Sequence, residues 1–223
     1  MRETRIAPPP SATGERPELL ILCGIAGLAG NVAPFAAMAL SVPVARHDFI
    51  ADTISDLGRG PHAWIMDTGF YMNAAGMLAL AIGAAHLHLG RWFWSLGILC
   101  LALLALVTVL LGIWDEFGAG PGASPDVSVH TKITYALAPL YVVGPLSMAG
   151  GAVRLMPRAR VLFVASAVLW AAFAVAFKLA PGDIDGIVEK VAIAATYGWT
   201  LPLALLLLRR GSRDARQGRG SAP

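Results

Sequence analysis

Six long apolar segments alternate with short polar segments along the chain. A helix needs about 20 mainly apolar residues to cross the hydrocarbon core of a bilayer. Six segments reach that length, at residues 19–42, 63–87, 92–114, 131–152, 161–180 and 187–208. Runs this long indicate helices, because the backbone of a spanning helix pairs its own N–H and C=O groups. The predicted fold class is all-α, a polytopic membrane protein with a six-transmembrane-helix bundle.

The first apolar segment carries residues that predict how it packs. Gly24, Gly27 and Gly30 fall on one side of a helix and would allow a neighbouring helix to come close. Pro34 removes the hydrogen bond to the carbonyl of Gly30 and is expected to bend the helix. Asn31 falls near the middle of the bilayer, where its amide needs a partner. This favours an interhelical hydrogen bond, with a ligand contact as the alternative.

Composition is consistent with one membrane domain and two polar tails. Only 14% of the 223 residues are charged, against about 25% in a typical soluble domain. We expect residues 18–210 to form the six-helix domain. Residues 1–17 and 211–223 are expected to be disordered tails, the second of them basic.

Lysines and arginines are distributed unequally between the two sides of the predicted bundle. Twelve fall in the two tails and in the turns at residue 91 and residues 154–160, and five fall on the opposite side. The positive-inside rule therefore predicts cytoplasmic termini, and we expect the bundle to lie in the plasma (inner) membrane. The basic C-terminal tail is interpreted as a topology signal with affinity for anionic lipid. Membrane lipids are thus the expected partners, and nucleic acid is not.

The acidic residues show the opposite bias, since ten of fourteen fall on the predicted outer side. The longest acidic segment is residues 47–58. Read as a helix, it has one apolar stripe and one polar face. The stripe consists of Ile50, Ile54 and Leu57, and the polar face of Asp48, Asp52 and Ser55 or Asp56. We expect a short amphipathic helix that lies in the outer interface or is tucked back between the spans. A solvated acidic loop is the alternative.

Further polar residues fall on the same side. Asp115 and Glu116 end the third apolar segment, and His130 and Lys132 open the fourth after a loop rich in glycine, proline and serine. An acid and a histidine that flank such a loop could form an acid–base or metal pair. The simpler interpretation is that Asp115 and Glu116 are loop acids and that Ser128 caps the helix.

The start of the sixth segment and the second segment add ionisable residues. Glu189 and Lys190 stand at the start of the sixth, where an acid also suits the positive end of the helix dipole. Asp67 lies about two turns into the second helix, and an ionisable residue at that depth is a functional candidate by default.

Together these residues define a candidate site. The ligand-binding candidates are Asp48, Asp52, Ser55, Asp56, Asp67, Asp115, His130, Lys132, Glu189 and Lys190. The candidate catalytic groups are Asp56, Asp115, His130 and Glu189, and the candidate metal ligands are Asp48, Asp56, Asp115 and His130. The sequence has no phosphate-binding loop, serine-centred elbow or His-Glu-x-x-His motif, so no cofactor is assigned.

The order of these motifs resembles a family of six-span prokaryotic membrane proteins, domain-of-unknown-function family 998, over residues 18–210. The matching residues are Asp48, the run Thr53-Ile54-Ser55-Asp56-Leu57-Gly58, Asp115, His130, Gly186, Glu189, Lys190 and Trp199. The chain departs from the family in having Ile113-Trp114 where such proteins often have Phe-Pro. The Ile-Ser-Asp stretch is also similar to one in Frag1/DRAM/Sfk1-like membrane proteins, some of which are linked to lipid handling. Neither resemblance implies a reaction.

Three functions remain open from the sequence. The first is a non-enzymatic protein whose outward-facing acidic and histidine-containing pocket binds a lipid headgroup or a small cationic ligand. The second is a membrane-embedded hydrolase or transferase, metal-dependent or not, that acts on lipid headgroups. The third is a small-solute transporter with Asn31, Pro34 and Asp67 along its path, although no ionisable residues continue that path through the inner halves of the helices.

The predicted orientation can be tested by labelling cysteines from outside the cell. Gly120→Cys is expected to react with a membrane-impermeant maleimide on intact cells, and Met156→Cys is not. The natural Cys23 and Cys100 fall inside apolar runs and should give little background. Labelling at position 156 and not at position 120 would show that the bundle is inverted.

Overall fold

The structure is all-helical over the residues that it describes. The computed structural model describes residues 16–87, 89, 92–114 and 129–220. Its elements are α1 (Pro17–Ala45), η1 (Ile54–Gly58, a 3₁₀ helix), α2 (Ala63–His86), α3 (Trp92–Trp114), α4 (Val129–Thr134), α5 (Leu137–Ala152), α6 (Ala159–Leu179) and α7 (Asp185–Gly220).

Within these residues, six helical segments are long and apolar enough to cross a bilayer. They are α1, α2, α3, α4 together with α5, α6, and α7. Large apolar side chains such as Leu22, Leu106 and Val168 are exposed around the bundle, as expected for surfaces that lipid covers. The chain is therefore a multi-pass membrane protein, as the apolar pattern predicted.

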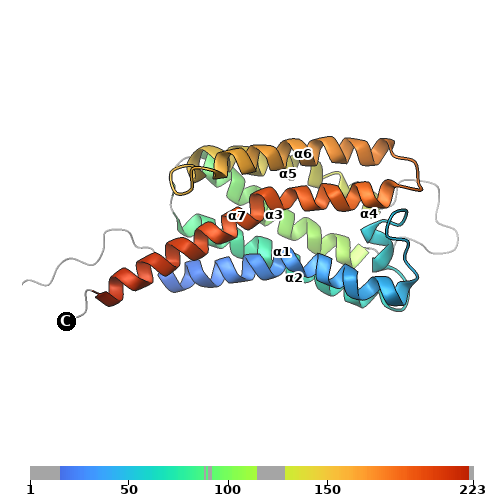
Figure 1. The fold of residues 1–223 in the computed structure, drawn as a ribbon, viewed down its shortest axis with the longest axis horizontal. Coiled ribbons are helices and arrows are strands. Elements are labelled where there is room, and N and C mark those ends of the chain that lie inside the picture. Colours follow the sequence, from blue (N-terminus) through green and yellow to red (C-terminus); the bar gives the residue numbers. More distant parts are fainter. Residues whose placement is uncertain (1–15, 88, 90–91, 115–128, 221–223) are drawn as a thin grey trace, which may run out of the picture.

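The six spans form a closed ring. Each span packs against its neighbours in chain order, and α7 packs against α1 and so closes the ring. Figure 1 shows the last turns of α7 and the start of α1 at one end of the bundle, and η1 at the other. We call these the arginine end, where Arg154, Arg158, Arg160 and the arginines after residue 208 lie, and the η1 end.

Glycines allow α1 to pack closely against α2. Each of Gly30 and Gly76 lies against the backbone of the other, and a Cβ on Gly30 would lie 2.6 Å from the Cα of Gly76. Pro34 cannot donate to the carbonyl oxygen of Gly30, and the side chain of Asn73 in α2 donates to that oxygen instead, at 3.0 Å. The lost helical bond is thus replaced by an interhelical one.

The interhelical partner expected for Asn31 is Thr200 in α7. The Thr200 hydroxyl donates to Asn31 Oδ1 at 2.5 Å, and Asn31 Nδ2 donates to the carbonyl of Gly27 at 2.7 Å. Both residues are buried. The predicted interhelical hydrogen bond is therefore confirmed, and it joins the first and last spans.

The fourth span is broken, although a continuous helix was predicted. The predicted single helix over 131–152 is divided into α4 and α5 at Tyr135 and Ala136. The cause is Pro139, whose ring clashes with the carbonyl four residues earlier, at Tyr135. The amide of Ala136 donates instead to the carbonyl of Ile133 at 3.0 Å, a tighter turn.

The short helix after the first span is present as η1, tucked back between the spans. Ile54 and Leu57 are buried against α1 and α2, whereas Ile50 is exposed. The expected single stripe over residues 47–58 is therefore wrong at its first position, because the chain turns at 49–52 before η1 begins.

The expectation of disorder after residue 210 is wrong for residues 211–220, because α7 continues to Gly220. An i,i+4 ion pair supports the extension, with Arg210 Nε 3.2 Å from the carboxylate of Asp214. Residues 1–15 and 221–223 lie outside the described part of the chain.

We expect Gly30→Ala to lower the free energy of unfolding by about 1–3 kcal/mol, because the added methyl group forces the two helix backbones apart. Thermal unfolding of the purified protein in detergent would measure the loss. Gly150→Ala is the matched control, since nothing lies within 4 Å of a Cβ at that position. Equal melting temperatures for the two variants would contradict the close packing.

Candidate functional site

A cavity of about 600 Å³ lies at the η1 end, between α4, α5, α6 and α7. We call it the lateral cavity. Its polar lining gathers at the η1 end and consists of Thr53, Ser55, Arg59, His130, Thr131, Thr134, Lys178 and Glu189. Its apolar walls include Leu137, Ala138, Val142, Trp170, Ala171, Ala174, Val175, Phe177, Leu179, Ala192 and Ile193. The η1 end of the cavity thus combines polar side chains with apolar ones such as Phe177, and its walls deeper in the bundle, around Val142 and Ala171, are apolar.

A second, smaller cavity of about 90 Å³ receives lining residues from all six spans. We call it the axial cavity. Pro34, Asn73, Thr108, Tyr141 and Tyr197 belong to its lining. Ser55, His130 and Glu189 line both cavities. These three side chains therefore stand where the two cavities meet.

A serine and a histidine form a direct contact at this junction. Ser55 lies in η1 and His130 in the first turn of α4, and Ser55 Oγ is 3.1 Å from His130 Nε2. Both residues are half-buried. When the neutral imidazole carries its proton on Nδ1, Nε2 accepts the hydroxyl proton of Ser55.

Glu189 holds η1 in place from the first turns of α7. Its Oε2 accepts a hydrogen bond from the backbone N–H of Ile54 at 2.6 Å. This N–H is one of the amides at the start of η1 that have no partner within the helix. Glu189 also lines the two cavities together with His130. Its carboxylate therefore acts on Ser55 through the position of η1 and lies in the same lining as His130.

Lys190 connects the loop that precedes η1, at residues 47–53, to α7. The residue is 3% exposed. Its Nζ donates to the carbonyl of Asp52 at 2.6 Å and to that of Gly186 at 3.3 Å, and lies 5.0 Å from the centre of the Phe49 ring. Lys190 was a predicted ligand contact, but its ammonium is engaged by backbone carbonyls.

Gly186 allows the same loop to reach α7. A Cβ at this position would lie 2.1 Å from the carbonyl oxygen of Asp52, so any side chain there would push the loop away. The backbone N–H of Ile187 donates to the carbonyl of Ile50 at 2.8 Å. The segment therefore docks on the N-terminal turn of α7 through backbone contacts that only glycine at 186 permits.

The loop carboxylates serve the loop itself. Asp48 Oδ1 accepts from the amides of Ile50 and Ala51 at 2.9 and 3.2 Å. Asp52 Oδ2 accepts from the amide of Asp48 at 2.7 Å. Asp56 Oδ2 accepts from the amide and the hydroxyl of Thr53, at 2.9 and 2.7 Å. None of these three carboxylates lines either cavity.

Two pKa shifts agree with this arrangement. The hydrogen bonds from the amides of Ile50 and Ala51 lower the pKa of Asp48, because they stabilise its charged form. Burial, followed by the charge of Lys190, lowers the pKa of His47. His47 Nδ1 lies 3.7 Å from the carboxylate of Asp52, and its side chain is 2% exposed. Asp48 therefore favours its charged form, and His47 favours its neutral form.

The predicted site residues thus divide into two groups. The cavities bring together Ser55, His130 and Glu189. Asp67 is buried in α2, Lys132 is exposed, and neither belongs to the lining of either cavity. Asp115 lies outside the described residues. Among the residues that the structure describes, no three of the His, Cys, Asp and Glu side chains are grouped so that they could hold a metal.

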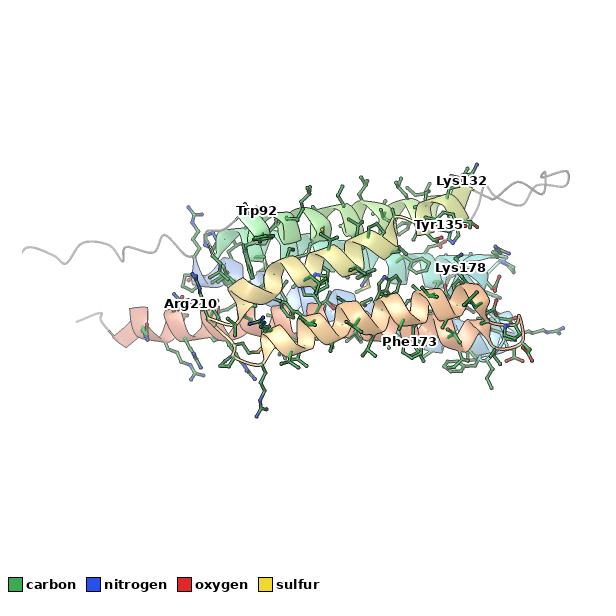
Figure 2. All side chains as sticks on the ribbon, turned by 90° about the horizontal axis from the view of Figure 1, so that it is seen from above. Trp92, Lys132, Tyr135, Phe173, Lys178 and Arg210 are labelled. Carbon is green, nitrogen blue, oxygen red and sulfur yellow. The ribbon has the colours of Figure 1, made fainter. Side chains whose placement is uncertain are left out.

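Other cavity residues were not selected from the sequence. Tyr135, Trp170 and Lys178 line the lateral cavity, and Lys178 Nζ lies 5.1 Å from the centre of the Tyr135 ring. Figure 2 shows Tyr135 and Lys178 near the same end of the bundle. Trp170 is 7% exposed, and its Nε1 has no hydrogen-bond partner among the described residues. The only sequence signal was a lysine next to the end of an apolar run.

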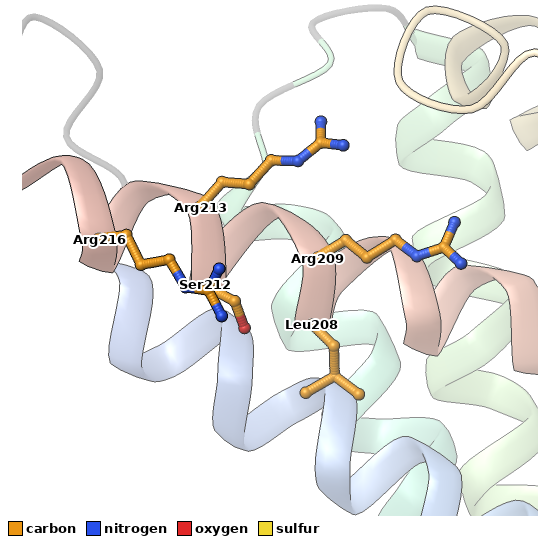
Figure 3. Close-up of a pocket in the computed structure, with 5 residues that line it drawn as sticks. All are labelled: Leu208, Arg209, Ser212, Arg213 and Arg216. Atoms are coloured by element: carbon orange, nitrogen blue, oxygen red, sulfur yellow. The ribbon is translucent and has the colours of Figure 1, made fainter.

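A separate hollow of about 250 Å³ lies at the arginine end, on the side of α7. It is lined by Leu208, Arg209, Ser212, Arg213 and Arg216 (Figure 3). All five residues belong to a single helix, and the arginine side chains spread along it. The hollow is therefore a basic helix surface, consistent with the expected affinity for anionic lipid.

Comparison with known proteins identifies the family. The model of the family described as "Protein of unknown function (DUF998)" matches residues 25–206, and the chain belongs to that family. No curated protein and no solved structure matches the chain. The similarity to Frag1/DRAM/Sfk1-like proteins stays a prediction.

Lys190→Met is expected to lower the free energy of unfolding by about 1–3 kcal/mol, because the carbonyl of Asp52 loses its charged donor. Limited proteolysis should also cut residues 47–53 faster in this variant. Lys132→Met removes an exposed lysine from the same end and is the matched control. If both variants unfold and are cleaved like the natural protein, Lys190 does not hold the loop.

Proposed function

We propose that this DUF998 protein binds a membrane lipid in the lateral cavity, with the headgroup at the η1 end and an acyl chain along the apolar walls. The observation that carries the proposal is the polarity of the cavity, which changes along its length from polar to apolar. A volume of about 600 Å³ falls within the usual range of ligand pockets, about 300–1,000 Å³.

The hydrogen bonds that the loop carboxylates accept favour a lipid over a small cation as the ligand. A cation site would need carboxylate oxygens that face the cavity. Asp48, Asp52 and Asp56 instead accept hydrogen bonds from their own loop and lie outside the lining. The acidic bias of the sequence is therefore better explained by loop structure than by ligand charge.

The charged groups that do line the lateral cavity favour an anionic headgroup. Arg59 and Lys178 contribute two cations to the lining, against the one carboxylate of Glu189. Arg59 lies at the exposed rim, where its Nη1 is 3.4 Å from Asp56 Oδ1. Lys178 is the cation nearer the apolar walls, because its ammonium lies beside the rings of Tyr135 and Phe177. A lipid phosphate at this level would meet positive charge.

A buried donor on the apolar wall also supports a ligand with polar groups beyond its headgroup. The indole N–H of Trp170 is buried without a partner among the described residues, and its side chain lines both cavities. A buried donor of this kind is costly unless an acceptor meets it. The ester carbonyl of a lipid would supply one below the headgroup.

The orientation predicted from the arginines is part of this proposal. With cytoplasmic termini, the η1 end faces outward and the lateral cavity receives lipid from the outer leaflet of the plasma membrane. The acidic loop would then lie at the outer surface, and the arginine-bearing part of α7 at the cytoplasmic surface.

Ala174→Trp is expected to fill the lateral cavity, because Ala174 belongs to its wall. The protein would be reconstituted with phosphatidylglycerol that carries a photoreactive group on one acyl chain, irradiated, and mapped by mass spectrometry. We expect crosslinks on α5 and α6 wall residues in the natural protein. We expect them to fall about tenfold in the variant, which corresponds to about 1.4 kcal/mol of binding.

Ala172→Trp is the matched control, since Ala172 is exposed on the outer surface of α6. It adds the same side chain to the same helix and should leave the crosslinks unchanged. Crosslinks confined to the outer surface of the bundle, and equal in both variants, would rule out a lipid in the cavity.

A further inference from the structure

We propose that Ser55 and His130 act as a nucleophile and general base that transfer the acyl group of an ester-linked lipid held in the lateral cavity. The inference rests on the proposed lipid binding and goes beyond it. It assigns a reaction to a site that otherwise only holds a ligand.

The geometry of the pair carries the proposal. Ser55 Oγ and His130 Nε2 are 3.1 Å apart although 75 residues separate them in the chain. This is the distance at which a base takes the proton of a nucleophile. Both side chains line both cavities, so the hydroxyl stands in contact with the space that a substrate would occupy.

The position of the pair along the cavity matches the position of an ester in a lipid. Ser55 and His130 belong to the polar lining at the η1 end, and the wall residues Leu137 and Trp170 lie further into the bundle. In a glycerol lipid, the carboxylic ester joins the headgroup region to the acyl chain. A lipid seated by this polarity would therefore place its ester carbonyl at the level of the Ser55 hydroxyl.

The reaction would proceed in two balanced halves. Ser55 Oγ attacks the ester carbonyl carbon while His130 Nε2 takes the hydroxyl proton. The carbon–oxygen bond to the alcohol then breaks, and His130 returns the proton to the departing alcohol oxygen. Water attacks the acyl-serine with His130 again as base, and Ser55 regains its proton as the fatty acid leaves. With an alcohol in place of water, the second half would complete an acyl transfer.

Nearby groups could assist these steps. Glu189 lines the same two cavities as His130, and its side chain would face the imidazolium that forms when His130 takes the proton. Glu189 also holds the amide of Ile54, next to Ser55, and so acts as a positioning residue for the nucleophile. The buried N–H of Trp170 is a donor on the cavity wall that could meet the developing oxyanion.

The test uses a fluorophosphonate probe, which forms a stable bond to an activated serine. The full-length protein in phosphatidylglycerol nanodiscs is treated with the probe, and the modified residue is located by tandem mass spectrometry. We expect the adduct on Ser55. Ser55→Ala should remove it, and His130→Gln should slow its formation about 100-fold or more, because the base is lost.

Ser212→Ala is the matched control, because Ser212 lies in α7 at the arginine end. It should label like the natural protein. The adduct site in the natural protein is read directly, so this arm does not depend on whether the variants fold. The photoreactive lipid reports separately whether each variant keeps its cavity.

The outcomes separate the two proposals. If the lipid crosslinks to the cavity wall but the probe does not modify Ser55, the acyl-transfer inference is wrong and lipid binding stands. An adduct on Ser55 that forms equally fast in His130→Gln would also overturn the inference, since the histidine would then not activate the serine. If the lipid does not crosslink to the cavity at all, the proposed function itself fails.

Discussion

The docking of residues 47–58 on the first turns of α7 is the contact on which the rest of the η1 end depends. Gly186 lets the two backbones meet, and Lys190 donates hydrogen bonds to the carbonyls of Asp52 and Gly186. Glu189 accepts a hydrogen bond from the first amide of η1. Burying a lysine ammonium is costly unless acceptors receive its hydrogen bonds. Here two backbone carbonyls accept them. Together with the packing of Ile54 and Leu57 against α1 and α2, this contact sets the position of Ser55 relative to His130.

Polar contacts inside the bundle fix the relative positions of the helices. Within a bilayer, apolar contact alone distinguishes poorly between two helices that touch and two that touch lipid. Gly30 removes the steric barrier to α2, and Asn73 donates to the carbonyl that Pro34 leaves without a helical donor. Asn31 makes a second polar link, to α7. One turn of α1 thus sets its position against both of its neighbours in the ring.

The length of the apolar runs was sufficient to predict the spans, because that length depends on the bilayer and not on tertiary contacts. The interhelical partner of Asn31 was also predictable in kind, since a buried amide needs one. The break at Tyr135 could have been predicted from Pro139 four residues later, but the apolar run concealed it. The sequence showed that the loop acids are clustered. It did not show their partners, because these are backbone amides that lie beside the carboxylates only in the folded loop. Trp170 was unpredictable for a similar reason, because nothing in a sequence shows that a buried indole faces a cavity.

The helix α7 is longer than the bilayer requires and joins the two ends of the bundle. Its 36 residues make a helix of about 54 Å, while the hydrocarbon core is about 30 Å thick, so part of this helix extends beyond the bilayer. The same helix begins at the cavity wall and carries Pro202 between that wall and the projecting arginines. Beyond Pro202 the helix stays packed on α1, because a Cβ on Gly24 would lie 2.9 Å from the carbonyl oxygen of Ala204 and one on Gly211 would lie 2.7 Å from that of Pro17. The wall of the lateral cavity and the arginine-bearing turns therefore belong to one continuous helix that the first span supports over most of its length.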